Sequence, residues 1–202
     1  MSNALFISVD LAQINDYTAI TIIESVGYEP MQEYHLRHIE RPERGTTYPK
    51  IVDRLRQLYH SKQLAAMQKT VVLDITGVGL PVWDLMQLNN DFRGRIKGIM
   101  ITGGNTVTED RDIFHVPKRD LISALQVAFQ NSQLKIARGL PDADTLVKEL
   151  TNFKVKINVN GHDQYEAWRE GIHDDIVLSA AMGVWLAARP IPRIYTSKIK
   201  LF

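Results

Sequence analysis

Acidic residues stand at three points of this sequence where carboxylate chemistry is plausible. Asp10 and Asp74 each close a short apolar run, and the pair Asp174 and Asp175 opens an apolar stretch near the C-terminus. A charge inside a sheet is costly unless it is paired or binds a cation. If the two apolar runs are neighbouring strands, Asp10 and Asp74 face each other across one end of a sheet. Because like charges repel, we expect a cation between them.

The composition narrows the kind of site that these acids can form. The chain has no cysteine, which excludes disulfides, cysteine zinc sites and thiol catalysis. Oxygen ligands favour Mg²⁺ or Mn²⁺ over zinc. Each acid also has an ordinary alternative, since Asp is common at strand ends and turns. Asp174 and Asp175 also suit the N-cap and first turn of a helix.

The length and charge of the chain indicate how many domains it forms and which surfaces it can have. The chain has 202 residues, 45% of them hydrophobic and 23% charged, which suits about one soluble domain. We expect a single domain over residues 1–202, with a core at about 4–188 and a basic tail at 189–202. The net charge of +1 excludes a strongly basic coat for nucleic acid but allows a local basic face. No apolar run reaches the roughly 18 residues of a membrane span.

The hydrophobic pattern predicts strands first and then strands alternating with helices. Three apolar, β-branched runs close to one another predict an antiparallel meander over 5–10, 17–24 and 31–39. The pattern further predicts helices at 48–66, 80–88, 117–129, 142–153 and 174–188, strands at 70–74 and 96–101, a loop at 103–114 and a short extended piece at 134–137. Alternation before Asn160-Gly161 predicts an extra β-hairpin over 153–168. This order predicts an α/β fold, a mixed central sheet with helices on both faces.

Three segments of the sequence carry a family resemblance when they are taken together. They are Ser8-Val9-Asp10 followed by Asp16 and Tyr17-Thr18-Ala19-Ile20, then Val72 to Gly79 (VLDITGVG), then His173 to Ala180 (HDDIVLSA). Over roughly residues 4–188 the chain resembles the nuclease domain of the large terminase subunit of tailed bacteriophages, a member of the ribonuclease H-like group.

The resemblance implies a fold and a metal site. The implied fold has a mixed sheet whose first three strands are antiparallel. The implied site holds two divalent ions, Mg²⁺ or Mn²⁺. Asp10 would bind both ions, Asp74 would bind one, and the third segment would bind the other. The family pattern favours Asp175 as that third ligand, whereas a helical wheel favours Asp174, so both remain candidates.

The implied activity is metal-dependent endonucleolytic cleavage of DNA. A large terminase nuclease cuts concatemeric viral DNA during genome packaging, and two metal ions suffice for phosphodiester hydrolysis without a side-chain nucleophile. The chain has no G-x-x-x-x-G-K-[ST] motif, so an ATPase motor would be a partner. The resemblance also implies double-stranded DNA, a small terminase subunit and a portal as partners. It implies no membrane, a monomeric isolated domain and a cytoplasmic location, the host cytoplasm if the protein is viral or prophage-encoded.

Several residues are candidates for accessory roles at such a site. Asp16 matches an acidic position of the family, His173 could contact a leaving group, and Lys118 could contact a phosphate. Lys154, Lys156, Arg189 and Arg193 could neutralise DNA phosphates without reading sequence. Each also has an ordinary alternative. Asp16 suits the turn before a strand and His173 a loop before a helix cap, both at least as well as the site role, and the lysines and arginines suit a solvated surface, which the sequence favours for Lys118.

Other functions fit parts of the same pattern. A Holliday-junction resolvase has a similar fold and metals but acts as a dimer on branched DNA. A non-catalytic ribonuclease H-like module would bind a partner, although it would not need the full set of acids. A sugar-kinase-like ATPase half would need a second lobe, for which 202 residues are too few.

Overall fold

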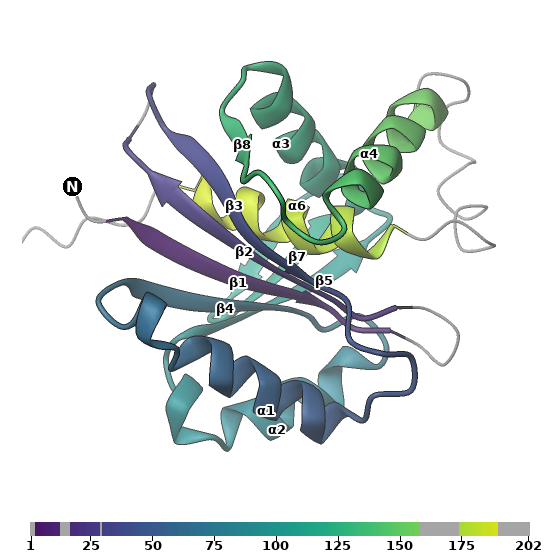
Figure 1. Cartoon of the computed structure of the whole chain (residues 1–202). Helices are drawn as coiled ribbons and strands as arrows, with labels where there is room; N and C mark the ends of the chain where they lie inside the picture. The colour runs from purple at the N-terminus through teal and green to yellow at the C-terminus, as the bar shows by residue number, and fades with distance from the viewer. Residues whose placement is uncertain (1–2, 13–16, 29, 158–173, 190–202) are drawn as a thin grey trace, which may run out of the picture.

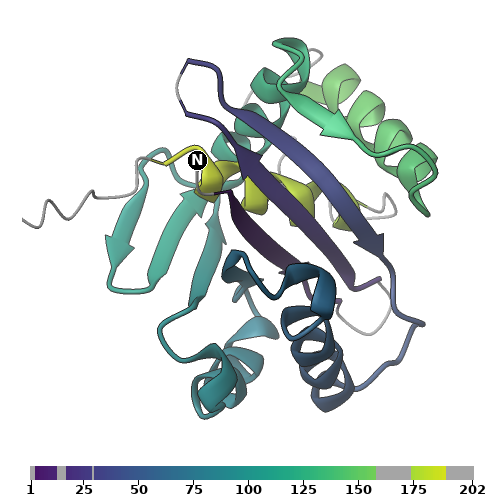
Figure 2. The same cartoon turned by 60° about the vertical axis from the view of Figure 1, so that its left-hand side comes forward.

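A central mixed β-sheet organises the computed structural model, which describes residues 3–12, 17–28, 30–157 and 174–189 (Figure 1). The sheet has eight strands in the order β6-β7-β5-β4-β1-β2-β3-β8. The strands are β1 (Ala4–Asp10), β2 (Ala19–Val26), β3 (Glu33–Glu40), β4 (Gln68–Asp74), β5 (Ile96–Thr102), β6 (Thr108–Asp110), β7 (Ile113–Pro117) and β8 (Leu134–Ile136). Figure 2 shows β8 beside β3 at one edge of the sheet, with β5, β7 and β6 towards the other edge.

The strand directions confirm the predicted mixed sheet. β1 pairs antiparallel with β2, and β2 pairs antiparallel with β3, as predicted for the first three strands. β4 runs parallel to β1, β5 to β4 and β7 to β5. The carboxyl ends of β1, β4, β5 and β7 therefore meet at one end of the sheet.

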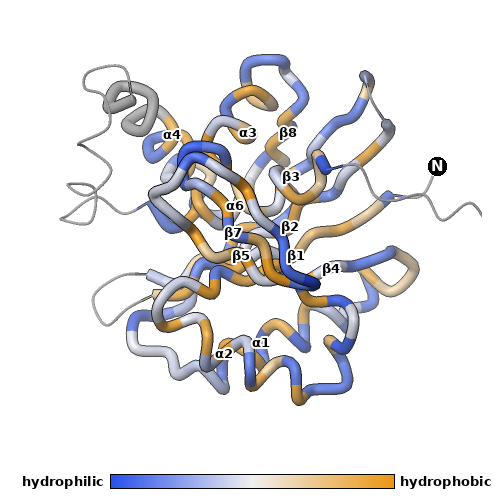
Figure 3. The backbone as a smooth tube through the Cα atoms, turned by 180° about the vertical axis from the view of Figure 1, so that it is seen from behind, coloured by the Kyte–Doolittle hydropathy of each residue, from blue (hydrophilic) through white to orange (hydrophobic). Residues whose placement is uncertain are grey.

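Helices cover both faces of the sheet, as predicted. They are α1 (Tyr48–Tyr59), α2 (Gly79–Gln87), α3 (Lys118–Gln130), α4 (Ala143–Ile157) and α6 (Asp175–Ala187), with short 3₁₀ turns at Lys62–Leu64 and Asn90–Phe92. In Figure 1, α1 and α2 lie below the sheet, and α3, α4 and α6 lie above it. Each face of the sheet has its own hydrophobic cluster. Figure 3 shows hydrophobic colouring along α6 and the inner strands, and hydrophilic colouring at many outer turns.

Helix α6 lies unusually close to the sheet. Every residue of α6 except Leu186 is buried. At Gly183 an added Cβ would come within 2.6 Å of the Ser8 hydroxyl oxygen on β1, so only glycine permits this approach. The Ser179 hydroxyl donates to the Ser8 carbonyl oxygen (2.9 Å) and lies 2.9 Å from the Thr21 hydroxyl. These contacts fix the N-terminal half of α6 against β1 and β2.

Three local predictions differ from the structure. The helix predicted at 48–66 ends at Tyr59, where His60 leaves helical geometry and a 3₁₀ turn follows. The predicted loop at 103–114 contains β6 and the start of β7, which form a hairpin. The predicted hairpin at 153–168 is wrong over 153–157, because α4 continues to Ile157, and its remainder lies outside the described residues. Within the described part of the chain, no helix is long and apolar enough to cross a bilayer.

Candidate active site

Asp10 and Asp74 lie side by side at the carboxyl ends of two neighbouring parallel strands. Val9 of β1 is in register with Leu73 of β4, so the next residue of each strand is one of these aspartates. Each aspartate is 9% exposed. Asp10 and Asp74, which end two apolar runs of the sequence, therefore lie next to each other in a buried position at the end of the sheet.

A tight turn after β4 fixes the Asp74 carboxylate. Asp74 Oδ1 accepts a hydrogen bond from the Thr76 backbone N–H (2.8 Å), and the Thr76 hydroxyl oxygen accepts one from Ile101 N–H (2.8 Å). An added Cβ at Gly79 would lie 2.0 Å from the Asp74 carbonyl oxygen. Gly79 therefore allows α2 to start directly after β4. The backbone N–H of Thr76 in this turn fixes the position of the Asp74 carboxylate.

The start of α6 contributes the other two predicted acids. Asp174 occupies the N-cap position of α6, as predicted. Its side chain makes no capping hydrogen bond, so the predicted capping role of the carboxylate is wrong. Asp174 Oδ2 instead accepts from Lys118 Nζ at 2.7 Å. Asp175 is buried and its Oδ2 accepts from Arg41 Nη2 at 2.8 Å. A lysine and an arginine therefore provide counter-charges for the two acids.

The four aspartates form one electrostatic cluster. Burial raises the pKa of Asp10 well above its usual value, and the charges of Asp74, Asp175 and Asp174 raise it further, while Lys118 lowers it. Burial also raises the pKa of Asp74. Hydrogen bonds from Thr76 and a hydrogen bond with the Asp10 carboxyl group lower this pKa but do not offset the effect of burial. Two carboxyl groups in such contact titrate as a pair. The structure thus brings Asp10, Asp74, Asp174, Asp175 and Lys118 together.

Glu149 of α4 is a site residue that the sequence analysis missed. It is 6% exposed, its Oε1 lies 3.4 Å from Arg41 Nη2, and its Oε2 accepts from the Val177 backbone N–H at 3.1 Å. Val177 is in the first turn of α6, whose N–H groups have no partner within the helix. Glu149 therefore supplies the hydrogen bond that an N-cap side chain would otherwise make. A buried glutamate on an otherwise ordinary amphipathic helix gave no signal in the sequence.

The environment of Glu149 predicts a pH-dependent stability. Burial raises its pKa to about 7, with the Val177 N–H and Arg41 opposing and Asp175 and Asp174 adding to the rise. The folded protein then holds a proton that the unfolded chain releases near the ordinary value of 4.5. Ionisation of Glu149 therefore removes stability as pH rises through this interval.

Glu149→Gln should remove this loss in the metal-free protein. We expect the melting temperature of the variant, relative to wild type, to increase as pH is raised from about 5 to about 8. Thermal melts in EDTA across this range measure the difference. Titrating groups distant from Glu149 are common to both proteins and cancel in the comparison. A difference in melting temperature that stays constant with pH would show that Glu149 does not titrate in this interval.

The donor set fits a hard divalent cation, although the acids are engaged with protein cations. The carboxylate oxygens of Asp10, Asp74 and Asp175 are the ligands that Mg²⁺ and Mn²⁺ prefer. Burial raises the pKa of Asp10 and of Asp74, and at Asp10 the charges of the other aspartates raise it further, so a bound cation would favour the ionised form of both acids. In the described residues no group of three or more acids or histidines is arranged to hold an ion as it stands. Asp175 and Asp174 are instead paired with Arg41 and Lys118.

The structure adds none of the remaining predicted residues to this cluster. Asp16, His173 and Arg193 fall outside the described residues. Lys154 and Lys156 are in α4 and not on a hairpin strand, which corrects their predicted placement.

Arg189, just after α6, stands apart from the acids. It stacks on Trp185 (4.7 Å from the guanidinium carbon to the ring centroid) and lies 3.5 Å from a Glu109 carboxylate oxygen. These contacts attach Arg189 to the β6–β7 side of the fold.

Two arginines that the sequence analysis did not single out adjoin the site. The guanidinium groups of Arg41 and Arg44 lie 4.5 Å and 4.0 Å from the centroid of the Tyr17 ring. Arg44 is exposed, and Arg41 is half-buried beside Asp175. The segment after β3 thus brings positive charge from the surface to the acidic cluster.

The strand order β3-β2-β1-β4-β5, with three antiparallel strands followed by parallel ones, is the mixed α/β fold that the sequence analysis predicts, and the acids lie at the shared strand ends. No protein-family model matches the chain, and no curated protein matches it. Among solved structures, the chain is similar to the human cytomegalovirus terminase nuclease domain in a manganese-soaked form. The identity is 12%, the match covers 91% of this chain and 82% of that chain, and the TM-score is 0.49.

Proposed function

We propose that the chain is a divalent-metal-dependent DNA endonuclease of the large terminase type. The observation that carries this proposal is the convergence of Asp10, Asp74 and Asp175 from β1, β4 and α6 in one buried cluster. About a third of the chain separates Asp10 from Asp74, and about half of it separates Asp74 from Asp175. All three acids belong to the segments that carry the family resemblance. Burying several carboxylates together costs stability unless they serve a charged ligand.

Each acid has a distinct proposed role. Asp10 is at the centre of the electrostatic cluster and would bind both ions, Asp74 would bind one, and Asp175 would bind the other. Asp174 remains the alternative to Asp175. When bound, two divalent ions supply an activated water and stabilise the leaving oxygen of a phosphodiester. Lys118 and Arg41 balance the charge of the acids while the ions are absent.

The proposed substrate is double-stranded DNA, held mainly through its phosphates. Arg44 is exposed beside Tyr17, where it is available to a phosphate. Phosphate contacts carry no sequence information, so we propose cleavage with little sequence preference. In the proposed packaging role an ATPase motor, a small terminase subunit and a portal would be the partners.

Purified protein should nick or linearise supercoiled plasmid when Mn²⁺ or Mg²⁺ is added. The acids need a divalent ion to act on a phosphodiester, so EDTA should stop cleavage. Gel electrophoresis of the plasmid over time measures the result. Cleavage at an equal rate in EDTA would contradict the metal-dependent mechanism. Intact plasmid with both metals would instead favour the non-catalytic module.

A further inference from the structure

Arg41 lies between two carboxylates that come from different helices. Its Nη2 is 2.8 Å from an Asp175 oxygen and 3.4 Å from a Glu149 oxygen. Its side chain is 15% exposed, and its guanidinium faces the Tyr17 ring. The shorter distance shows that Arg41 is engaged mainly by Asp175 and has a second acid within reach.

Glu149 is fixed independently of Arg41. Its other oxygen accepts from the Val177 N–H, and this bond joins α4 to the first turn of α6. The carboxylate therefore stays beside Asp175 whether or not Arg41 contacts it. Glu149 is in a position to receive the guanidinium if Asp175 is taken by another cation.

The present pairing leaves the guanidinium incompletely bonded. Arg41 Nε is buried and has no hydrogen-bond partner among the described residues. A buried donor without a partner costs free energy. A guanidinium pairs most strongly with a carboxylate through two parallel hydrogen bonds. A shift of Arg41 onto Glu149 offers such a bidentate pair.

We propose that Arg41 is a positioning residue that acts as the internal counter-ion of Asp175, and that Glu149 receives Arg41 when a divalent cation binds Asp175. The inference rests on the proposed function, because it takes Asp175 as a metal ligand. It adds two residues, Arg41 and Glu149, that set how tightly the ion is held. Arg41 competes with the ion, whereas Glu149 assists the ion by drawing Arg41 away.

Two substitutions should change metal affinity in opposite directions. Arg41→Gln removes the competitor, so the Kd for Mn²⁺ should fall by about threefold or more. Glu149→Gln keeps an oxygen for the Val177 N–H but loses the charge that receives Arg41, so the Kd should rise by about threefold or more. Isothermal calorimetry with MnCl₂ on the full chain, at about pH 8 and without DNA, measures both. A merely structural role would not produce opposite signs.

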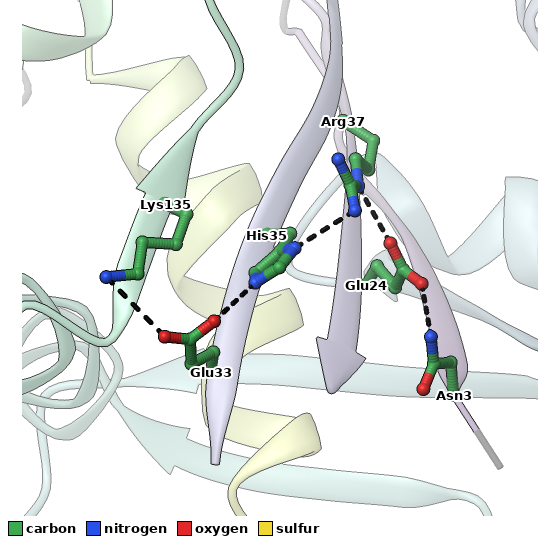
Figure 4. A network of polar contacts seen from close by, with 6 residues as sticks. All are labelled: Asn3, Glu24, Glu33, His35, Arg37 and Lys135. Carbon is green, nitrogen blue, oxygen red and sulfur yellow. Dashed lines mark hydrogen bonds and ion pairs between the residues drawn. The ribbon is translucent and has the colours of Figure 1, made fainter. Parts of the chain in front are cut away.

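Arg37→Gln is the matched control. Figure 4 shows Arg37 on the buried Glu24 carboxylate (2.7 Å), again an arginine paired with a buried acid. Glu24 pairs with Leu5, at the opposite end of β2 from the Ala19 that pairs with Asp10. We expect the Mn²⁺ affinity of Arg37→Gln to equal that of wild type. Arg41→Lys serves if Arg41→Gln fails to fold. Lysine keeps the charge but pairs less strongly with a carboxylate than a guanidinium does, so its Kd for Mn²⁺ should lie below that of wild type, and a Kd equal to that of wild type would overturn the inference.

The outcomes separate this inference from the proposed function. Wild type that binds no Mn²⁺ overturns the proposed function, and the inference with it. Wild type that binds Mn²⁺ while Arg41→Gln binds it no more tightly overturns the inference alone. The same holds if Glu149→Gln binds Mn²⁺ as tightly as wild type or more tightly.

Discussion

Asp10→Asn should abolish metal-dependent cleavage and leave the metal-free protein at least as stable as wild type. Asp10 is buried among three other aspartates, whose charges raise its pKa. The uncharged amide has a similar shape and relieves this repulsion, so the melting temperature in EDTA should stay level or rise. Loss of a shared metal ligand removes several kcal/mol of charge stabilisation, which corresponds to a rate loss of about 100-fold or more.

The measurement pairs plasmid cleavage with thermal melts on the same preparations. Asp84→Asn, on the exposed face of α2, makes the same chemical change outside the cluster and should leave both quantities unchanged. Asp74→Asn should also be inactive, since its amide oxygen can still accept from Thr76 N–H but carries no charge. A clear fall in melting temperature with cleavage retained would mean that Asp10 is structural.

Asp175→Asn should destroy cleavage, whereas Asp174→Asn should keep more activity. Asp175 is buried against Arg41, while Asp174 is nearer the surface and paired with Lys118. The change in melting temperature should be small for Asp175→Asn, because Arg41 retains Glu149 as a charged partner. Breaking a buried pair is strongly destabilising only when it leaves a charge uncompensated.

Both asparagine variants need a comparison that separates a ligand from a helix cap. Asp174→Ala serves this purpose, since loss of a capping side chain costs about 1 kcal/mol. Because the Asp174 side chain makes no capping hydrogen bond, we expect Asp174→Ala to melt close to Asp174→Asn. An inactive Asp174→Asn beside an active Asp175→Asn would reverse the assignment that the family pattern favours. Normal cleavage by both would remove α6 from the site.

The part of the site on β1 and β4 could be predicted because its signal is local. An apolar run ending in a carboxylate marks Asp10 and Asp74, and the parallel register of β1 and β4 then places them together. The sheet could be predicted for the same reason, since each strand is a compact apolar run. That Asp174 or Asp175 binds a metal ion stays a prediction, and the sequence does not choose between them because both acids open the same helix.

Pairings between distant segments could not be predicted. Arg41 is 108 residues from Glu149 and 134 residues from Asp175, and neither Arg41 nor Glu149 has a local pattern that marks a site. The hairpin expected at Asn160-Gly161 shows the opposite error. Alternation over 154–157 suits a strand locally, but the helix that begins at Ala143 extends through it. Tertiary context overrides such short patterns.

The close packing of α6 has a consequence for how the site can move. Helix α6 is buried between the sheet on one side and α3 and α4 on the other (Figure 1). At Gly183 the helix is in such close contact with β1 that there is no space for a side chain. Segments with many buried contacts open only with the whole domain. Backbone amides of α6 beyond its first turn should therefore exchange with deuterium only through global unfolding. The carboxylate on the first turn of α6 is then attached to a slowly exchanging helix, and adjustment of the site is left to side chains such as Arg41.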